Sequence, residues 1–170
     1  MIRKTLLSLT LLWMQAAALQ AQVTLTERAV ARTDFELVAA DCAAVCYDAA
    51  DASVVETAAG LFAADVARVT GREIPVVAGQ EFPAKTRCAV IVGTIGRSRW
   101  IDELIAAKKI DVSAVEGGWE RYAIRLVDRP GHGVRKALVI AGSDRRGTAY
   151  GLLSLSEAIG VSPWYWWADV

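Results

Sequence analysis

The residues best suited to bind a ligand form the turn 142–147, which joins a buried strand to the start of a helix. Ser143 or Asp144 can accept hydrogen bonds from the first free N–H groups of that helix. The same helix end attracts anions, so a carboxylate or a phosphate could bind beside Arg145 or Arg146. The structural alternative is that Asp144 only caps the helix and Arg146 pairs with a carboxylate of the same domain. The glycine spacing fits neither a phosphate loop nor a dinucleotide fingerprint, so a nucleotide site is not predicted.

Glu157 lies late in the same helix, and a run rich in tryptophan follows it. Aromatic faces can stack on sugar rings, and a carboxylate can accept hydrogen bonds from sugar hydroxyls. This pattern suggests a sugar contact. The alternatives are that Glu157 is only an exposed helix residue, and that Trp164, Trp166 and Trp167 pack in a core or between domains. We favour packing for the tryptophans.

No catalytic residue is predicted in this chain. A sugar hydrolase needs two carboxyl groups across the scissile bond, and the Asp and Glu residues here are scattered over helices and turns. Ser154 and Ser156 have no His partner, which excludes a hydrolase triad. The single His, His132, lies in a glycine-rich turn and is expected to be a solvated loop residue.

Three cysteines are present, Cys42, Cys46 and Cys88. Cys42 and Cys46 have too few further ligands around them for a zinc site, so no metal and no cofactor is predicted. The odd count leaves at least one free thiol. A Cys42–Cys88 or a Cys46–Cys88 disulfide would tie adjacent strands, whereas small buried thiols are the simpler interpretation.

Residues 1–21 have the features of a signal peptide: two early positive charges, an apolar stretch and small residues before Gln22. We therefore expect export to the periplasm or the extracellular space, with no membrane association after cleavage; an uncleaved anchor helix is the alternative. The formal net charge is zero. Cleavage would remove Arg3 and Lys4 and leave −2, so a nucleic-acid binder is not expected.

The spacing of apolar residues and the turn signals along the chain predict alternating strands and helices, which position these residues. The first predicted helix begins with a capping box at Ser53 and Glu56 and ends at Gly71. Its predicted apolar stripe is Val55, Ala59, Phe62, Val66 and Val69. Strands are expected at 34–39, 45–47, 74–78, 88–94, 120–128 and 136–141, and further helices at 98–109 and 144–159. These predict one α/β domain over residues 24–163, a layered mixed β-sheet with about three helices.

The segment from Gly142 to Gly151, with the stretch Leu155–Val170, resembles the N-terminal domain of glycoside hydrolase family 115, the xylan α-1,2-glucuronidases. A looser pattern, Asp144-x-Arg-Gly-x-x-Tyr-Gly151, is similar to the N-terminal α/β domains of families 20 and 67. The resemblance implies that residues 164–170 begin the connection to a catalytic (β/α)₈ barrel. It also implies that Glu157 could contact the rim of the sugar pocket and that the tryptophans form the seam between the domains. Asp144 and Arg145 are the other candidate substrate-binding residues.

The resemblance implies that this chain is a non-catalytic part of an exported enzyme, and that the enzyme removes glucuronic acid or its 4-O-methyl ether from xylan. The chain would be inactive alone, with the barrel as its partner and glucuronoxylan as the substrate. The full-length enzyme could form a homodimer. The alternative is a stand-alone glycan-binding or interaction module.

Overall fold

The computed structural model of this chain describes residues 34–38, 43–79 and 87–162. The segments 1–21 and 164–170, with the predicted signal peptide and the three terminal tryptophans, lie outside these ranges. The elements in chain order are β1 (Ala44–Tyr47), α1 (Ser53–Thr70), β2 (Val76–Ala78), β3 (Cys88–Thr94), α2 (Arg99–Ala106), β4 (Tyr122–Gly131), β5 (Val134–Gly142) and α3 (Arg145–Ala158). No helix in the described part is long and apolar enough to span a bilayer.

The five strands form one mixed sheet in the order β2-β1-β3-β5-β4. The pairs β2–β1, β1–β3 and β3–β5 are parallel, and β4 is antiparallel to β5 at the sheet edge. The carboxyl ends of β1, β3 and β5 therefore lie next to one another at the same end of the strands. We call this end of the sheet the carboxyl edge. This architecture confirms the predicted layered α/β fold with a mixed sheet and three helices.

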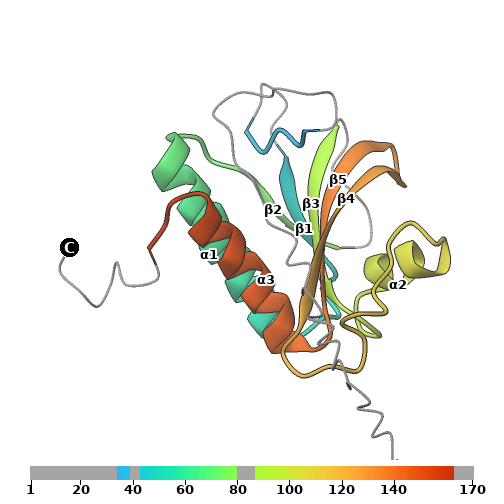
Figure 1. The fold of residues 1–170 in the computed structure, drawn as a ribbon. Helices are drawn as coiled ribbons and strands as arrows, with labels where there is room; N and C mark the ends of the chain where they lie inside the picture. The colour runs from blue at the N-terminus through green and yellow to red at the C-terminus, as the bar shows by residue number, and fades with distance from the viewer. Residues whose placement is uncertain (1–33, 39–42, 80–86, 163–170) are drawn as a thin grey trace, which may run out of the picture.

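Helices cover the two faces of the sheet unequally, as Figure 1 shows. Helices α1 and α3 lie side by side on one face, where Phe62 and Leu152 are fully buried beside β-branched residues of the strands. Helix α2 covers the opposite face, where Trp100 and Ile101 are buried. Each central strand is thus covered on both sides, which explains why β3 is a nearly continuous apolar run.

Helix α1 confirms the predicted end but not the predicted start. The chain leaves the helix at Gly71, whose φ of 70° is the left-handed conformation that a glycine adopts without strain. The predicted capping box is wrong, because Ser53 is already the first helical residue and Ala52 occupies the capping position without a side-chain bond. The preceding turn is closed by Asp51 N, which donates a hydrogen bond to Asp48 O at 3.0 Å, and Asp51 Oδ1 accepts one from Ala52 N at 2.7 Å.

Two further sequence predictions are wrong in the described part. Residues 34–38 are not a strand but an irregular segment, in which Phe35 and Leu37 pack against the core beneath α1 and α3. Lys136 Nζ donates a hydrogen bond to Asp34 O at 2.9 Å, so a side chain contacts the segment where a strand ladder was expected. Val69 is half exposed because it lies in the last turn of α1, beyond the sheet-facing stripe.

The described cysteines, Cys46 and Cys88, are free thiols. Cys46 is buried on the α2 face of the sheet, whereas Cys88 packs against the α1 and α3 face, so the alternative of a Cys46–Cys88 disulfide is excluded and the favoured interpretation as free thiols is confirmed for these two residues. Burial raises the pKa of Cys46 to about 12. Cys42 lies outside the described residues.

Candidate functional site

The predicted turn after β5 is built around Asp144, whose carboxylate uses both oxygens. Oδ1 accepts hydrogen bonds from Arg146 N at 2.9 Å and from Gly147 N at 2.8 Å, which confirms the predicted helix cap. Oδ2 accepts a hydrogen bond from Glu120 N at 2.7 Å, in the loop before β4. The bonds from Gly147 and Glu120 hold the pKa of Asp144 below its usual value. The cap therefore also joins two segments that are distant in the sequence.

The loop before β4 lies directly against the first turn of α3. Arg121 N donates to Ser143 Oγ at 3.0 Å, and Ser143 N donates to Arg121 O at 2.9 Å. The approach is so close that a Cβ on Gly147 would overlap the Arg121 carbonyl oxygen. Gly147 is thus required by its contact with the backbone of this loop.

Arg146 is engaged within the domain. Its Nη1 lies 2.8 Å from Glu120 Oε1, and its Nη2 donates a hydrogen bond to Tyr150 OH at 3.1 Å. The guanidinium carbon also lies 5.9 Å from the centre of the Tyr150 ring. The structural alternative predicted for Arg146 is confirmed, since it pairs with a carboxylate of its own domain.

Arg145 and Asp144 line a hollow of about 370 Å³ at the carboxyl edge of the sheet. The other lining residues come from the end of β3, the loop that follows it, and the turn after β5: Thr94, Ile95, Arg97 and Ser143. Arg97 and Arg145 are both exposed. Within the described part of the chain, no hydrogen bond or ion pair involves either guanidinium. The structure thus adds Arg97 to the residues that the sequence had singled out.

The floor of this hollow is held by buried polar contacts. Thr94 Oγ1 lies 2.9 Å from Thr148 Oγ1, which joins the end of β3 to the first turn of α3. Thr94 N donates a hydrogen bond to Asp51 Oδ2 at 2.7 Å, so the loop after β1 is bound to the same point. These contacts fix the two strand ends that carry the hollow, which keeps its lining residues in place.

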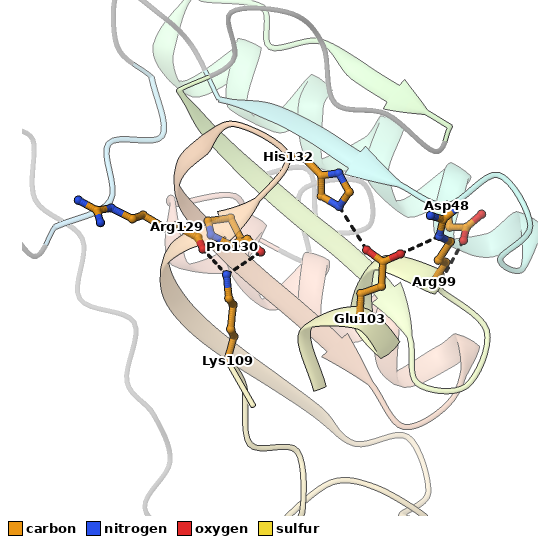
Figure 2. Close-up of polar contacts among 7 residues, drawn as sticks. All are labelled: Asp48, Arg99, Glu103, Lys109, Arg129, Pro130 and His132. Carbon is orange, nitrogen blue, oxygen red and sulfur yellow. Dashed lines mark hydrogen bonds and ion pairs between the residues drawn. The ribbon is translucent and has the colours of Figure 1, made fainter. Parts of the chain in front are cut away.

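A second polar cluster lies on α2 and contacts the hairpin tip between β4 and β5 (Figure 2). Glu103 Oε1 accepts a hydrogen bond from Arg99 Nε at 2.7 Å, and Glu103 Oε2 lies 3.2 Å from His132 Nε2. Lys109 Nζ, beyond the end of α2, donates to the carbonyl oxygens of Arg129 and Pro130. His132 is an exposed residue of the turn, as predicted, with a side chain that is 42% exposed, and the structure adds its contact with Glu103.

The start of α2 is bonded to the loop after β1. Asp48 Oδ2 accepts a hydrogen bond from Arg99 N at 2.9 Å (Figure 2). Asp48 Oδ1 accepts one from Ala50 N at 2.9 Å. Ser98 occupies the capping position of α2 but makes no side-chain cap bond. A carboxylate that is distant in sequence thus takes over the cap. The sequence offered no signal for it, because caps are read from neighbouring residues.

Glu157 and the turn after β5 lie at opposite ends of α3. Glu157 is exposed near the last turn, and at 1.5 Å per residue it lies roughly 18 Å along the helix axis from Arg145. Asp144 and Arg145 are brought together in one hollow, and Glu157 is not part of it. A shared contact with one sugar ring is therefore not available to all three within the described residues.

No metal centre is formed by the part of the chain that the structure describes, where no three His, Cys, Asp or Glu side chains gather suitably. The carboxylates of Asp48, Asp51 and Asp144 instead accept hydrogen bonds from backbone N–H groups. What the carboxyl edge can do chemically is bind an anion through its two exposed arginines.

The chain is similar to a solved structure described as a novel family GH115 4-O-methyl-α-glucuronidase, BtGH115A, with specificity for decorated arabinogalactans. The identity is 34%, the TM-score is 0.57, and the match covers 75% of this chain but 14% of that one. No family model matches the sequence, and no curated protein matches it. The predicted resemblance to family 115 is confirmed by the structural match, and the chain contains a glycoside hydrolase-related α/β domain.

Proposed function

We propose that this chain is the non-catalytic α/β domain of an exported α-glucuronidase related to family 115. The catalytic groups would lie on a separate (β/α)₈ barrel that begins beyond residues 164–170. The observation that carries the proposal is the match to 14% of a much longer glucuronidase, at 34% identity over 75% of this chain. The match therefore corresponds to about one domain of that enzyme.

The electrostatics of the carboxyl edge support a non-catalytic role. Glycoside hydrolysis needs one carboxylic acid that stays protonated near neutral pH, which requires a raised pKa. The backbone N–H groups of Gly147 and Glu120 lower the pKa of Asp144 instead. Asp48 and Asp51 likewise accept backbone hydrogen bonds that hold neighbouring loops. All three carboxylates are thus engaged with backbone N–H groups that hold loops in place.

The substrate class that follows is a polysaccharide with glucuronic acid or 4-O-methylglucuronic acid side chains. Xylan is the substrate that the sequence resemblance implies. The solved relative is described as specific for decorated arabinogalactans. The main chain of the polysaccharide could therefore be xylan or arabinogalactan. Both substrates carry the same acidic sugar, and the proposal commits to that sugar.

The exposed side of α3 supports a domain partner. Tyr150 and Leu153 are exposed on α3, and Tyr122 and Leu126 are exposed on the adjacent strand β4. Tyr122 lies against α3, because a Cβ on Gly151 would contact its ring at 3.3 Å. We propose that this surface, together with Trp164, Trp166 and Trp167, contacts the barrel, and that Glu157 reaches the rim of its sugar pocket. Export through residues 1–21 belongs to the same proposal.

A domain exchange with the solved relative tests this function. The matched segment of BtGH115A is replaced by this chain, and uronic acid release is measured on glucuronoxylan and on decorated arabinogalactan. We expect the chimera to retain activity, a version without the segment to lose it, and the 170-residue chain alone to release nothing above a heat-inactivated blank. Release by the isolated chain, or full activity without the segment, would overturn the proposal. A Glu157→Gln chimera tests the rim contact separately.

A stand-alone glycan-binding module is the second candidate function. One observation favours it: the hollow at the carboxyl edge with exposed Arg97 and Arg145. Binding of an acidic sugar by the isolated chain, with an inactive chimera, would favour this candidate over the first.

A further inference from the structure

We propose that the hollow between the loop after β3 and the first turn of α3 is an accessory site that binds the carboxylate of a uronic acid. Arg97 and Arg145 are the binding residues. The choice of a uronate among small anions rests on the proposed function, whereas the anion site itself rests on the structure alone.

The position of the hollow in the sheet is the first argument. Strands β3 and β5 are adjacent and parallel, and the hollow lies at their carboxyl ends. The chain leaves β3 towards α2 on one face of the sheet, and it leaves β5 towards α3 on the other face (Figure 1). Where neighbouring connections diverge in this way, the strand ends are left uncovered, and open α/β sheets bind their ligands there.

The charge at the hollow is the second argument. Arg146 is bound to Glu120 and Tyr150, and Arg99 is bound to Glu103, so neither is available to a ligand. Arg97 and Arg145 both line the hollow, and no ion pair or hydrogen bond of either guanidinium occurs among the described residues. Two arginines brought together from loops almost fifty positions apart in sequence, without an acidic partner, provide a surplus of positive charge.

The acidic side chains beside the hollow, Asp144 and Asp102, are bound to backbone N–H groups and form no ion pair with Arg97 or Arg145. Asp144 is held by three backbone N–H groups, from Arg146, Gly147 and Glu120. Asp102 Oδ1 accepts a hydrogen bond from Gly96 N at 2.8 Å. Since the start of α3 is already capped by Asp144, the two guanidinium groups carry the proposal and the helix end does not.

The size of the hollow and the chemistry of arginine select the ligand. A volume of about 370 Å³ is within the range of small-molecule sites, roughly 300–1,000 Å³. The planar guanidinium fork matches a carboxylate with two parallel hydrogen bonds. The Asp144 carboxylate, fixed in the wall of the hollow, can accept a hydrogen bond from a sugar hydroxyl. A ring that carries one carboxylate and several hydroxyls satisfies both kinds of group.

Binding to the 170-residue chain tests the proposal without any requirement for catalysis. Methyl α-glucuronide, methyl α-glucoside and sulfate are titrated into the ¹⁵N-labelled protein, and amide shifts are followed by NMR. We expect weak saturable binding of the glucuronide, with the largest shifts at 94–98 and 143–145, and none with the glucoside. Arg97→Gln and Arg145→Gln should each weaken binding about tenfold, as loss of a charge-assisted hydrogen bond predicts.

Arg72→Gln serves as the matched control, because Arg72 is exposed just beyond α1 and does not line the hollow. It should leave the affinity unchanged. Equal binding of sulfate and glucuronide would overturn the uronate assignment and leave only an unspecific anion site. No saturable shift at 94–98 and 143–145 would overturn the site itself, whatever the outcome of the chimera experiment.

Discussion

Helices α3 and α2 are attached to the same sheet by different kinds of contact. Around α3 the attachment is made through the backbone: Asp144 binds three N–H groups, and Gly147 lets the Arg121 carbonyl approach. Around α2 the polar attachment to the hairpin tip is made through long exposed side chains, those of Glu103 and Lys109. Both helices also bury apolar residues, and the start of α2 is itself held by the Asp48 carboxylate, so the difference lies between the start of α3 and the contact of α2 with the hairpin tip.

The difference indicates where the domain needs a fixed geometry. The approach of Gly147 to the Arg121 carbonyl involves no rotamer, and Asp144 is a short side chain held by three N–H groups. A lysine or a glutamate, in contrast, loses more side-chain entropy on binding and is screened by solvent. The α3 side holds the hollow and continues towards the proposed domain interface, so it requires precision. The contacts between α2 and the hairpin tip lie away from the residues that line the hollow. Four substitutions test this difference between the two helices.

Gly147→Ala should have the largest effect, about 3 kcal/mol or more of lost unfolding free energy, because a backbone oxygen must move to admit the methyl group. Gly60→Ala is the matched control. Gly60 lies in the middle of α1 and is exposed, and a Cβ there meets nothing within 4 Å. That change should stabilise the domain by about 0.5–1 kcal/mol. Urea denaturation measures both, and a Gly147→Ala variant as stable as wild type would refute the close-contact argument.

Asp144→Ala should cost about 2 kcal/mol, since it removes a helix cap and an additional bond to the loop before β4. Because the folded pKa of Asp144 is lowered, its contribution is present above the ordinary Asp pKa of about 3.9 and is lost as the pH falls below it. The stability difference between wild type and variant should therefore shrink at acidic pH. A difference that stays constant from pH 7 to pH 3 would contradict the role of the ionised carboxylate.

Lys109→Met should cost about 1 kcal/mol, because it removes the ammonium that binds two carbonyl oxygens of the hairpin tip and keeps most of the aliphatic stem. The expected change is local. Hydrogen exchange should accelerate at the tip, residues 129–133, and remain unchanged around the start of α3. If α3 lost protection as well, the two attachments would be one cooperative unit.

Glu103→Gln should have the smallest effect, about 0.5 kcal/mol or less, since the contacts to Arg99 and His132 are exposed. The bonds from Arg99 and then from His132 lower the pKa of Glu103, so the contribution is present above the ordinary Glu pKa of about 4.3 and disappears below it. Thermal unfolding at pH 7 and pH 3 measures the difference. A loss comparable with that of Asp144→Ala would remove the contrast between the two helices.

The sequence predicted most accurately those elements whose signals are local. Strand β3 was predicted with the observed bounds, because a continuous apolar run between polar segments indicates a strand covered on both faces. The cap of α3 was predicted because Asp144 precedes a helical pattern that ends at Gly160. Where a similar signal failed, at Ser53, the competing turn with Asp51 displaced the helix start by one residue.

What could not be predicted depends on contacts between distant segments. Asp48 binds the first N–H of α2, and Asp51 binds the end of β3. Arg97 joins Arg145 at the hollow only because β3 and β5 are neighbours in the sheet. Strand order was the missing information: once it is known, the carboxyl ends of adjacent parallel strands identify the hollow without further signals.

The hairpin that inserts β5 between β3 and β4 also has a consequence for how the domain folds. Its two strands meet across a turn of a few residues, so β4 and β5 can pair early and at little cost in loop entropy. The pairing of β3 with β5 must close a loop that contains α2 and all of β4. We expect docking of the preformed hairpin to limit the folding rate. Substitutions at the β3–β5 contact, such as Val90→Ala, would then slow folding, and those in α2 would mainly accelerate unfolding.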